Sequence, residues 1–212
     1  MKLLVIGATG GTGKEIVKQA ASAGHLVTAL VRDAGKGGFG PPVEMAVGDV
    51  LDPGSLKMAV TGQDAVVCSL GSAATGPFKE MTLLSKGTHN LVAAMQAQGV
   101  GRLVCITGIG ASESKGHGPW YYNWLIQPLV LRGVYKDKTR QEAIVRGSGL
   151  AWTLVRPALL TNGVKKGHEV VRAITELAGA HVTTVSRADV AAFCLQELAD
   201  GRYQSEAPVI TY

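Results

Sequence analysis

The sequence predicts an α/β protein in which helices flank a doubly wound parallel sheet, with a small C-terminal extension. Apolar strand-like runs alternate with helix-like stretches through residues 1–156, which is the pattern of right-handed β–α–β crossovers. The first run, residues 3–6, is apolar at every position, as expected for a strand buried on both faces. Because 212 residues fit one domain, we expect a single unit over residues 1–212.

Each predicted element has a local reason. Residues 12–23 place apolar side chains at helical spacing and end before Gly24, a common residue after a helix C-terminus. Asp52 followed by Pro53 begins a second helix, because aspartate caps helix N-termini and proline suits the first helical position. Further helices are predicted over 81–98 and 136–146. The predicted strands of this region are 3–6, 25–32, 43–47, 64–70, 102–107 and 151–156.

The last quarter of the chain is less regular. Strands are predicted near 170–174, 182–185 and 207–211. Ser186 and Asp189 have the spacing of a capping box, which predicts a helix over 187–198. We expect the elements on the substrate side to lie within 108–135 and 157–185.

The glycine-rich turn after the first strand does not fit a P-loop for nucleoside triphosphates. Alignment of that motif on Gly13 and Lys14 requires a glycine at position 8 and a serine or threonine at position 15. The chain has Ala8 and Glu15 instead. A carboxylate in that loop would repel a phosphate, so the triphosphate interpretation fails.

The same turn fits a dinucleotide fingerprint between a strand and a helix. Its glycines suit a tight turn, a close approach of the backbone to a pyrophosphate, and close packing of the helix on the sheet. The turn therefore predicts a Rossmann-type dinucleotide site, and a glycine-rich turn without a ligand is the alternative. The predicted cofactor-binding residues of this loop are Gly7, Thr9, Gly10, Gly11, Thr12 and Gly13.

The end of the second predicted strand bears on the choice between NAD and NADP. An acidic residue there binds the ribose hydroxyls of NAD, whereas an arginine meets the 2′-phosphate of NADP. Arg32, with Lys36 nearby, favours NADP(H). Asp33 keeps NAD open as the alternative, since it has the acidic group at nearly the same place.

Two further strand ends have residues that suit a dinucleotide. Asp49 and Val50 follow the third strand, where the carboxylate of Asp49 can accept a hydrogen bond from an adenine amino group. Leu70 and Gly71 follow the fourth strand, where a small residue leaves space for the cofactor. Ligands of open α/β sheets bind along these carboxyl ends.

Composition excludes several classes of function. The net charge is +5, but Lys and Arg are scattered without a run of four, so we expect no direct binding of nucleic acid. No apolar run approaches 18 residues, so we expect no membrane span. Cys68, Cys105 and Cys194 lack metal-ligand spacing. They predict no metal site and free thiols in a reducing, cytoplasmic compartment.

These motifs together resemble the atypical short-chain dehydrogenase/reductases. The similar stretches are GATGGTG, VRD, GDVLD, DAVVCSLG, SGLAWTLVRP (148–157) and SRADVA (186–191). Within that family the chain is most similar to NmrA-like NAD(P)-binding proteins and to the flavin reductase also called biliverdin-IXβ reductase. The resemblance implies a Rossmann core with NADP(H), a monomer or weak homo-oligomer, and Pro157 as a further cofactor-binding residue.

The catalytic pair of the family is incomplete in this chain. Family reductases use Tyr-x-x-x-Lys on one helix, where the tyrosine donates a proton and the lysine binds the nicotinamide ribose. The resemblance assigns the lysine to Lys138, but the tyrosine position is Val134, and Tyr135 lies about 100° around the helix. Thr107 replaces the family serine after the fifth strand. We predict Thr107 and Lys138 as catalytic residues that also bind the cofactor.

The missing tyrosine favours a conjugated electron acceptor. Reduction of a carbonyl calls for an acid beside the new alkoxide, whereas solvent can protonate the heteroatoms of a flavin or quinone. We therefore expect an NADPH-dependent reductase with a small planar acceptor. Residues 118–126 are rich in Trp and Tyr, which stack on such molecules but also pack cores and oligomer contacts. The alternative function is an NmrA-like redox sensor that binds NADP(H) without turnover.

Overall fold

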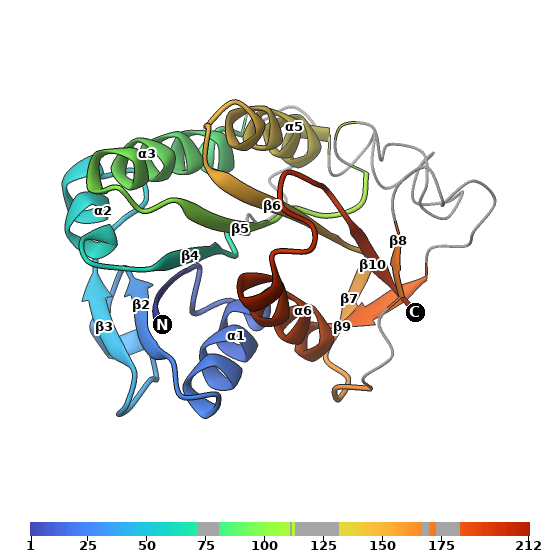
Figure 1. Ribbon diagram of the computed structural model, residues 1–212, viewed down its shortest axis with the longest axis horizontal. Coiled ribbons are helices and arrows are strands. Elements are labelled where there is room, and N and C mark those ends of the chain that lie inside the picture. The colour runs from blue at the N-terminus through green and yellow to red at the C-terminus, as the bar shows by residue number, and fades with distance from the viewer. Residues whose placement is uncertain (72–80, 111, 113–131, 167–169, 173–182) are drawn as a thin grey trace.

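The computed structural model describes residues 1–71, 81–110, 112, 132–166, 170–172 and 183–212 (Figure 1). An eight-stranded sheet with the order β3-β2-β1-β4-β5-β6-β10-β8 forms its centre. Neighbouring strands run parallel, except that β8 pairs antiparallel with β10 at one edge. The strands are β1 (Lys2–Ile6), β2 (Leu26–Val31), β3 (Glu44–Val47), β4 (Ala65–Cys68), β5 (Arg102–Ile106), β6 (Ala151–Pro157), β8 (Val170–Arg172) and β10 (Val209–Thr211).

Helices cover both faces of this sheet, which confirms the predicted doubly wound α/β fold. α1 (Gly11–Ser22) and α6 (Arg187–Asp200) lie on one face, and α2 (Pro53–Val60), α3 (Leu83–Gln98) and α5 (Arg132–Arg146) lie on the other (Figure 1). β1 shows why both faces are apolar. Leu3 and Val5 pack in the core under α1 and α6, while Leu4 and Ile6 pack under the other three helices.

The strand order changes direction between β1 and β4. The chain builds outward from β1 through β2 to β3, and then returns to the centre to build β4, β5 and β6 on the other side. The carboxyl ends of β1 and β4 therefore flank a crevice. Open α/β sheets bind their ligands at such a point.

Two predicted helix starts can be compared with the observed caps. The Asp52 carboxylate accepts hydrogen bonds from the backbone N–H groups of Gly54 (2.9 Å) and Ser55 (3.3 Å), as an N-cap aspartate should. The Ser186 hydroxyl caps α6 by accepting from the Asp189 N–H at 3.0 Å. In a full capping box the Asp189 side chain would also accept from the Ser186 N–H. Here the Ser186 N–H donates to the Tyr212 hydroxyl instead.

Several element boundaries differ from the sequence prediction. α5 begins at Arg132, four residues before the predicted position 136. β4 ends at Cys68, two residues before the predicted end at 70, and Ser69, Leu70 and Gly71 line the crevice. The parallel pair β7 (Leu159–Thr161) and β9 (Thr184–Ser186) includes a strand, β7, that the sequence analysis missed. The aromatic segment 118–126 lies outside the described residues.

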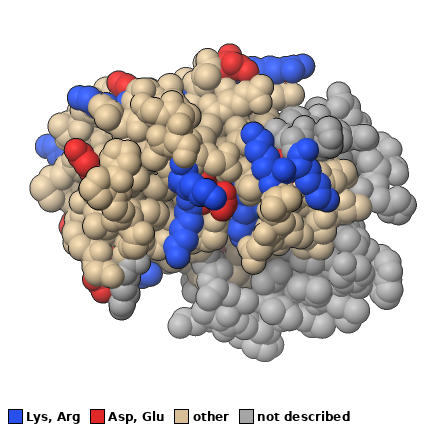
Figure 2. All heavy atoms as spheres, turned by 90° about the horizontal axis from the view of Figure 1, so that it is seen from below, with Lys and Arg blue, Asp and Glu red and all other residues tan. Residues whose placement is uncertain are grey.

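One face of the molecule is notably basic. Figure 2 looks onto the side that carries α1 and α6, and Lys and Arg side chains gather in the middle of that view. Lys14 and Lys18 of α1 are both exposed. No helix within the described part of the chain is long and apolar enough to cross a bilayer.

Candidate cofactor-binding and active site

A cavity of about 390 Å³ lies at the carboxyl ends of β1, β2, β3 and β4. It brings together predicted cofactor residues from four separate strand ends. Its lining residues are Ile6, Gly7, Thr9, Gly10, Leu30, Val31, Arg32, Gly48, Asp49, Val50, Ser69, Leu70, Gly71 and Leu83. Because the four ends are distant in the chain, the parallel sheet is what assembles this cavity.

The glycine-rich loop that borders the cavity leaves no space for side chains at two positions. Gly7 has φ +73°, and a Cβ atom added to it would lie 2.3 Å from the Ser69 carbonyl oxygen. A Cβ atom at Gly13 would lie 2.1 Å from the Gly7 carbonyl oxygen. That oxygen also accepts a hydrogen bond from the Gly10 N–H at 3.0 Å. Glycine at these positions lets the loop pass against β4 and lets α1 begin directly behind it.

The start of α1 has the donors that a pyrophosphate requires. Gly10 is the N-cap and supplies no side-chain acceptor, and the first turn contains no acidic residue. The N–H groups of Gly11, Thr12 and Gly13 have no acceptor within the helix, because the first N–H groups of any α-helix lack one. The helix dipole adds positive potential at the same place. The residues present therefore fit a diphosphate group.

Among the lining residues of the cavity, Arg32 is the cation and Asp49 is the carboxylate. Arg32 lines the cavity at the end of β2. The neighbouring Asp33 uses its carboxylate to accept from the Gly35 N–H at 2.9 Å, which caps the short 3₁₀ helix η1 (Ala34–Lys36). Lys36 is the last residue of η1, and its side chain is not among the parts that the structure describes.

Asp49 is held in place by its own neighbours. Its carboxylate accepts from the Leu51 N–H at 2.8 Å, and its backbone N–H donates to the Ser55 hydroxyl at 3.1 Å. The Ser55 hydroxyl donates in turn to the Asp49 carbonyl oxygen at 2.9 Å. These bonds fix the loop after β3 against the start of α2, so the edge of the cavity is rigid.

Three predicted residues meet at the ends of β5 and β6. The Lys138 ammonium donates to the Thr107 carbonyl oxygen at 2.6 Å, and the Ile109 N–H donates to the Pro157 carbonyl oxygen at 3.1 Å. A Cβ atom at Gly108, which has φ +143°, would lie 2.9 Å from the Lys138 Nζ atom. Thr107, Lys138 and Pro157 therefore form one cluster beside the end of β4.

The Thr107 hydroxyl is engaged by a buried ion pair that the sequence analysis did not anticipate. It donates to Glu142 Oε1 at 2.8 Å. Glu142 also accepts from Arg156 Nε at 3.0 Å and from Arg156 Nη2 at 2.5 Å, and all three side chains are buried. In this arrangement the Thr107 hydroxyl proton is engaged by the Glu142 carboxylate. An arginine within the apolar stretch AWTLVRP was the available signal, because a buried charge needs a partner.

Burial changes the acidity of Lys138. Desolvation lowers the pKa of its ammonium to about 8, and the negative charge of Glu142 opposes part of that shift. The ammonium of Lys138 also lies 5.2 Å from the centre of the Tyr135 ring. Val134, which has the position of the family tyrosine, is buried. The described part of α5 therefore presents a lysine without the paired tyrosine.

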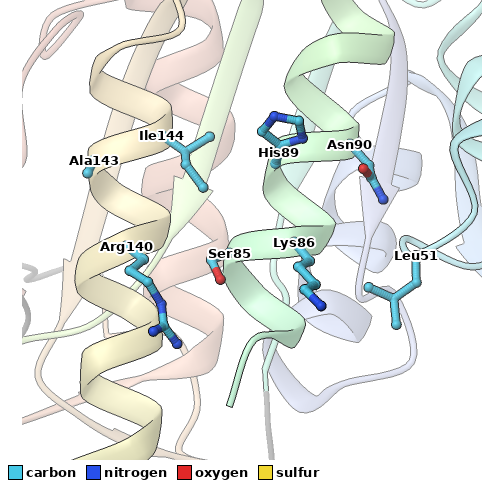
Figure 3. Close-up of a pocket in the computed structure, with 8 residues that line it drawn as sticks. All are labelled: Leu51, Ser85, Lys86, His89, Asn90, Arg140, Ala143 and Ile144. Atoms are coloured by element: carbon cyan, nitrogen blue, oxygen red, sulfur yellow. The ribbon is translucent and has the colours of Figure 1, made fainter. Parts of the chain in front are cut away.

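A second hollow lies on the outer side of α3 and α5 (Figure 3). It has a volume of about 700 Å³. Its lining residues are Leu51, Ser85, Lys86, His89, Asn90, Arg140, Ala143 and Ile144. None of the predicted cofactor or catalytic residues is among them. Within the described residues, no group of three or more His, Cys, Asp or Glu side chains is arranged to hold a metal ion.

The chain has curated relatives that are similar to it in sequence. The chain is 27% identical over 215 residues to the NAD(P)H azoreductase of Xenophilus azovorans, covering 99% of this chain and 67% of the relative. It is 33% identical over 180 residues to an uncharacterized chloroplast protein of Arabidopsis thaliana, covering 80% of this chain. The chain spans only 63% of the length of that plant relative.

A solved structure shares the fold at low sequence identity. ChuY, an anaerobillin reductase from Escherichia coli O157:H7, superposes with a TM-score of 0.80 and 20% identity, over 100% of this chain and 97% of its own. A family model described as NAD(P)H-binding matches residues 7–201, from the first glycine of the loop to the end of α6. The chain therefore belongs to the NAD(P)H-binding family of Rossmann-fold proteins.

Proposed function

We propose that the protein is an NADPH-dependent reductase whose acceptor is a flavin, a quinone or a similar conjugated molecule. One observation carries the proposal: Thr107, Lys138 and Pro157 cluster at the ends of β5 and β6, and the position four residues before Lys138 is the buried Val134 and not a tyrosine. Such a site can orient a nicotinamide and an acceptor. Among the described residues, the position from which the family tyrosine would protonate a substrate alkoxide has Val134 instead.

The preference for NADPH rests on the two residues after β2. Arg32 lines the cavity, which supports a contact between its guanidinium and the 2′-phosphate. Asp33 would favour NAD if its carboxylate bound the ribose hydroxyls. It instead accepts a hydrogen bond from the Gly35 N–H, which orients that carboxylate toward the turn.

The other residues of the site bind and orient. The N–H groups at the start of α1 hold the pyrophosphate, and Asp49 accepts from the adenine amino group. The Lys138 ammonium on α5, which lies at the end of β5, holds the nicotinamide ribose. A bound reduced nicotinamide supplies a hydride, and orientation is the main contribution of the protein to such a transfer. Solvent supplies the proton to a heteroatom of the acceptor.

The azoreductase relative supports a conjugated acceptor. The Xenophilus azovorans protein is an NAD(P)H azoreductase, and an azo group is a conjugated acceptor that is not a carbonyl. An azo dye therefore belongs with riboflavin, FMN and quinones in the set of acceptors to test.

A redox sensor that binds NADP(H) without turnover is the second candidate. It is favoured by the hydrogen bond from the Thr107 hydroxyl to Glu142, because that bond engages the hydroxyl proton within the protein.

Two measurements on the purified protein separate these functions. Calorimetry tests binding of NADPH, and the loss of NADPH absorbance tests its oxidation with each acceptor in turn. Oxidation above background with an acceptor of this class supports the reductase. Binding without oxidation by any of them supports the sensor, and the absence of binding overturns both.

A further inference from the structure

Arg187 lies against the glycine-rich loop although it is far from the loop in the sequence. It is the first residue of α6, and Gly11 is the first residue of α1. A Cβ atom added to Gly11 would lie 2.8 Å from both Cδ and Nε of Arg187, and 3.6 Å from its Cζ. The Arg187 side chain therefore crosses the N-terminus of α1 at a position that glycine leaves open.

The surroundings hold Arg187 in this position. The Gln19 amide on α1 donates to the Ala188 carbonyl oxygen at 2.9 Å, which joins α1 to the start of α6. The guanidinium donates from Nη1 to the Asn162 side-chain oxygen at 2.6 Å. Asn162 directly follows β7, so Arg187 bridges the loop at the start of α1 to the segment after β6 and β7.

The positive charge of Arg187 is not neutralised by the acidic residues near it. The Asp189 carboxylate accepts from the Ser186 hydroxyl at 2.7 Å and from the Lys166 N–H at 3.2 Å. The Glu15 carboxylate accepts from the Gln19 amide at 3.5 Å. Across the ranges that the structure describes, no carboxylate forms an ion pair with Arg187. The face that carries α1 and α6 is also rich in Lys and Arg (Figure 2).

We propose that Arg187 binds the pyrophosphate of the dinucleotide at the N-terminus of α1. The inference rests on the proposed function, because it requires that this loop holds the cofactor. The backbone N–H groups approach the pyrophosphate from the helix, and the guanidinium approaches it from α6. A planar guanidinium suits two phosphate oxygens at once. Asn162 links this contact to the substrate side of the site.

Arg187 and Arg32 then recognise different phosphates. The pyrophosphate is common to NADH and NADPH, whereas the 2′-phosphate is present only in NADPH. Loss of Arg187 should lower the affinity for NADH and the affinity for NADPH by the same factor. Loss of Arg32 should weaken the binding of NADPH and leave the binding of NADH unchanged.

The test is calorimetric titration of wild type, Arg187→Ala, Arg187→Gln and Arg32→Ala with NADPH, NADH and adenosine 2′-monophosphate. A charge-assisted hydrogen bond to phosphate corresponds to roughly tenfold to hundredfold in Kd. We expect a loss of that size for both dinucleotides in the Arg187 variants, with no change for adenosine 2′-monophosphate. Lys18→Ala is the matched control, because it removes an exposed positive charge from the same face.

The outcomes distinguish this inference from the proposed function. If wild type binds neither dinucleotide, the proposed function fails first. If wild type binds and both Arg187 variants bind as tightly, or if Lys18→Ala weakens binding equally, the role of Arg187 is wrong and the proposed function stands. Thermal melts by circular dichroism verify that each variant is folded. Arg187→Gln, which keeps a donor for Asn162, serves if Arg187→Ala does not fold.

Discussion

At the scale of single residues, Thr107 connects two parts of the site. Its carbonyl oxygen accepts from Lys138, and its hydroxyl donates to Glu142 inside the ion pair with Arg156. Breaking a buried pair of this kind by removing one partner typically costs about 3–5 kcal/mol. The pair therefore holds the end of β5 against α5 and β6, where the Thr107 carbonyl oxygen accepts from Lys138.

Lys138 should make cofactor binding depend on pH. Its pKa of about 8 means that the ammonium predominates at neutral pH and is lost as the pH rises through that value. One pH unit above the pKa only about a tenth of the side chain remains charged. We therefore expect the affinity for NADPH, measured by calorimetry, to fall by up to about tenfold over this interval.

Substitution of the lysine gives the control for this pH dependence. Lys138→Met should bind NADPH weakly at every pH and show a flat profile over the same interval. Lys136→Met, which removes an exposed lysine from the same helix, should keep the wild-type profile. A wild-type profile in Lys138→Met would remove Lys138 from the cofactor site.

At the scale of elements, α1 and the loop before it act as one unit. The helix begins at Gly11, directly after a loop whose glycines contact one another and β4. Its dipole and unpaired N–H groups point to the crevice for that reason. The local sequence is sufficient to specify this unit, because strand, glycine spacing and amphipathic helix are adjacent in the chain.

Gly13→Ala should damage both stability and cofactor binding. The new Cβ atom would lie 2.1 Å from the Gly7 carbonyl oxygen, so α1 has to move away from the loop. Overpacking of this kind costs about 1–3 kcal/mol of the free energy of unfolding. We expect a loss of that size in urea denaturation, together with a weaker NADPH isotherm. Gly101→Ala, which adds a Cβ atom with nothing within 4 Å, is the control and should be neutral.

At the scale of the whole molecule, the parallel sheet decides which residues meet. Its change of direction between β1 and β4 places four strand ends around one cavity and leaves β5 and β6 beside it. The two layers of helices bury both faces, so the strand ends are held on a rigid frame. Cofactor binding across several strand ends should therefore stabilise the domain as a unit.

NADPH should raise the melting temperature of the protein. At a hundred times its Kd, a ligand that binds only the folded state adds about 2.7 kcal/mol, which corresponds to roughly 5–10 °C for a domain of this size. NADH at the same multiple of its own Kd should give the same shift. Arg32→Ala should lose most of the NADPH shift at a fixed concentration and keep the NADH shift. The absence of any shift with both nucleotides would contradict dinucleotide binding.

The sequence by itself determined the α/β class, the order of the elements through β6 and the residues at the strand ends. Those features follow from local periodicity, from glycine spacing and from the rule that parallel strands end at a common edge. Only the tertiary structure decided the partners of Thr107, the β7–β9 pair and the position of Arg187 over Gly11. These contacts join segments far apart in the chain, and a buried or bridging charge shows its partner only when the chain is folded.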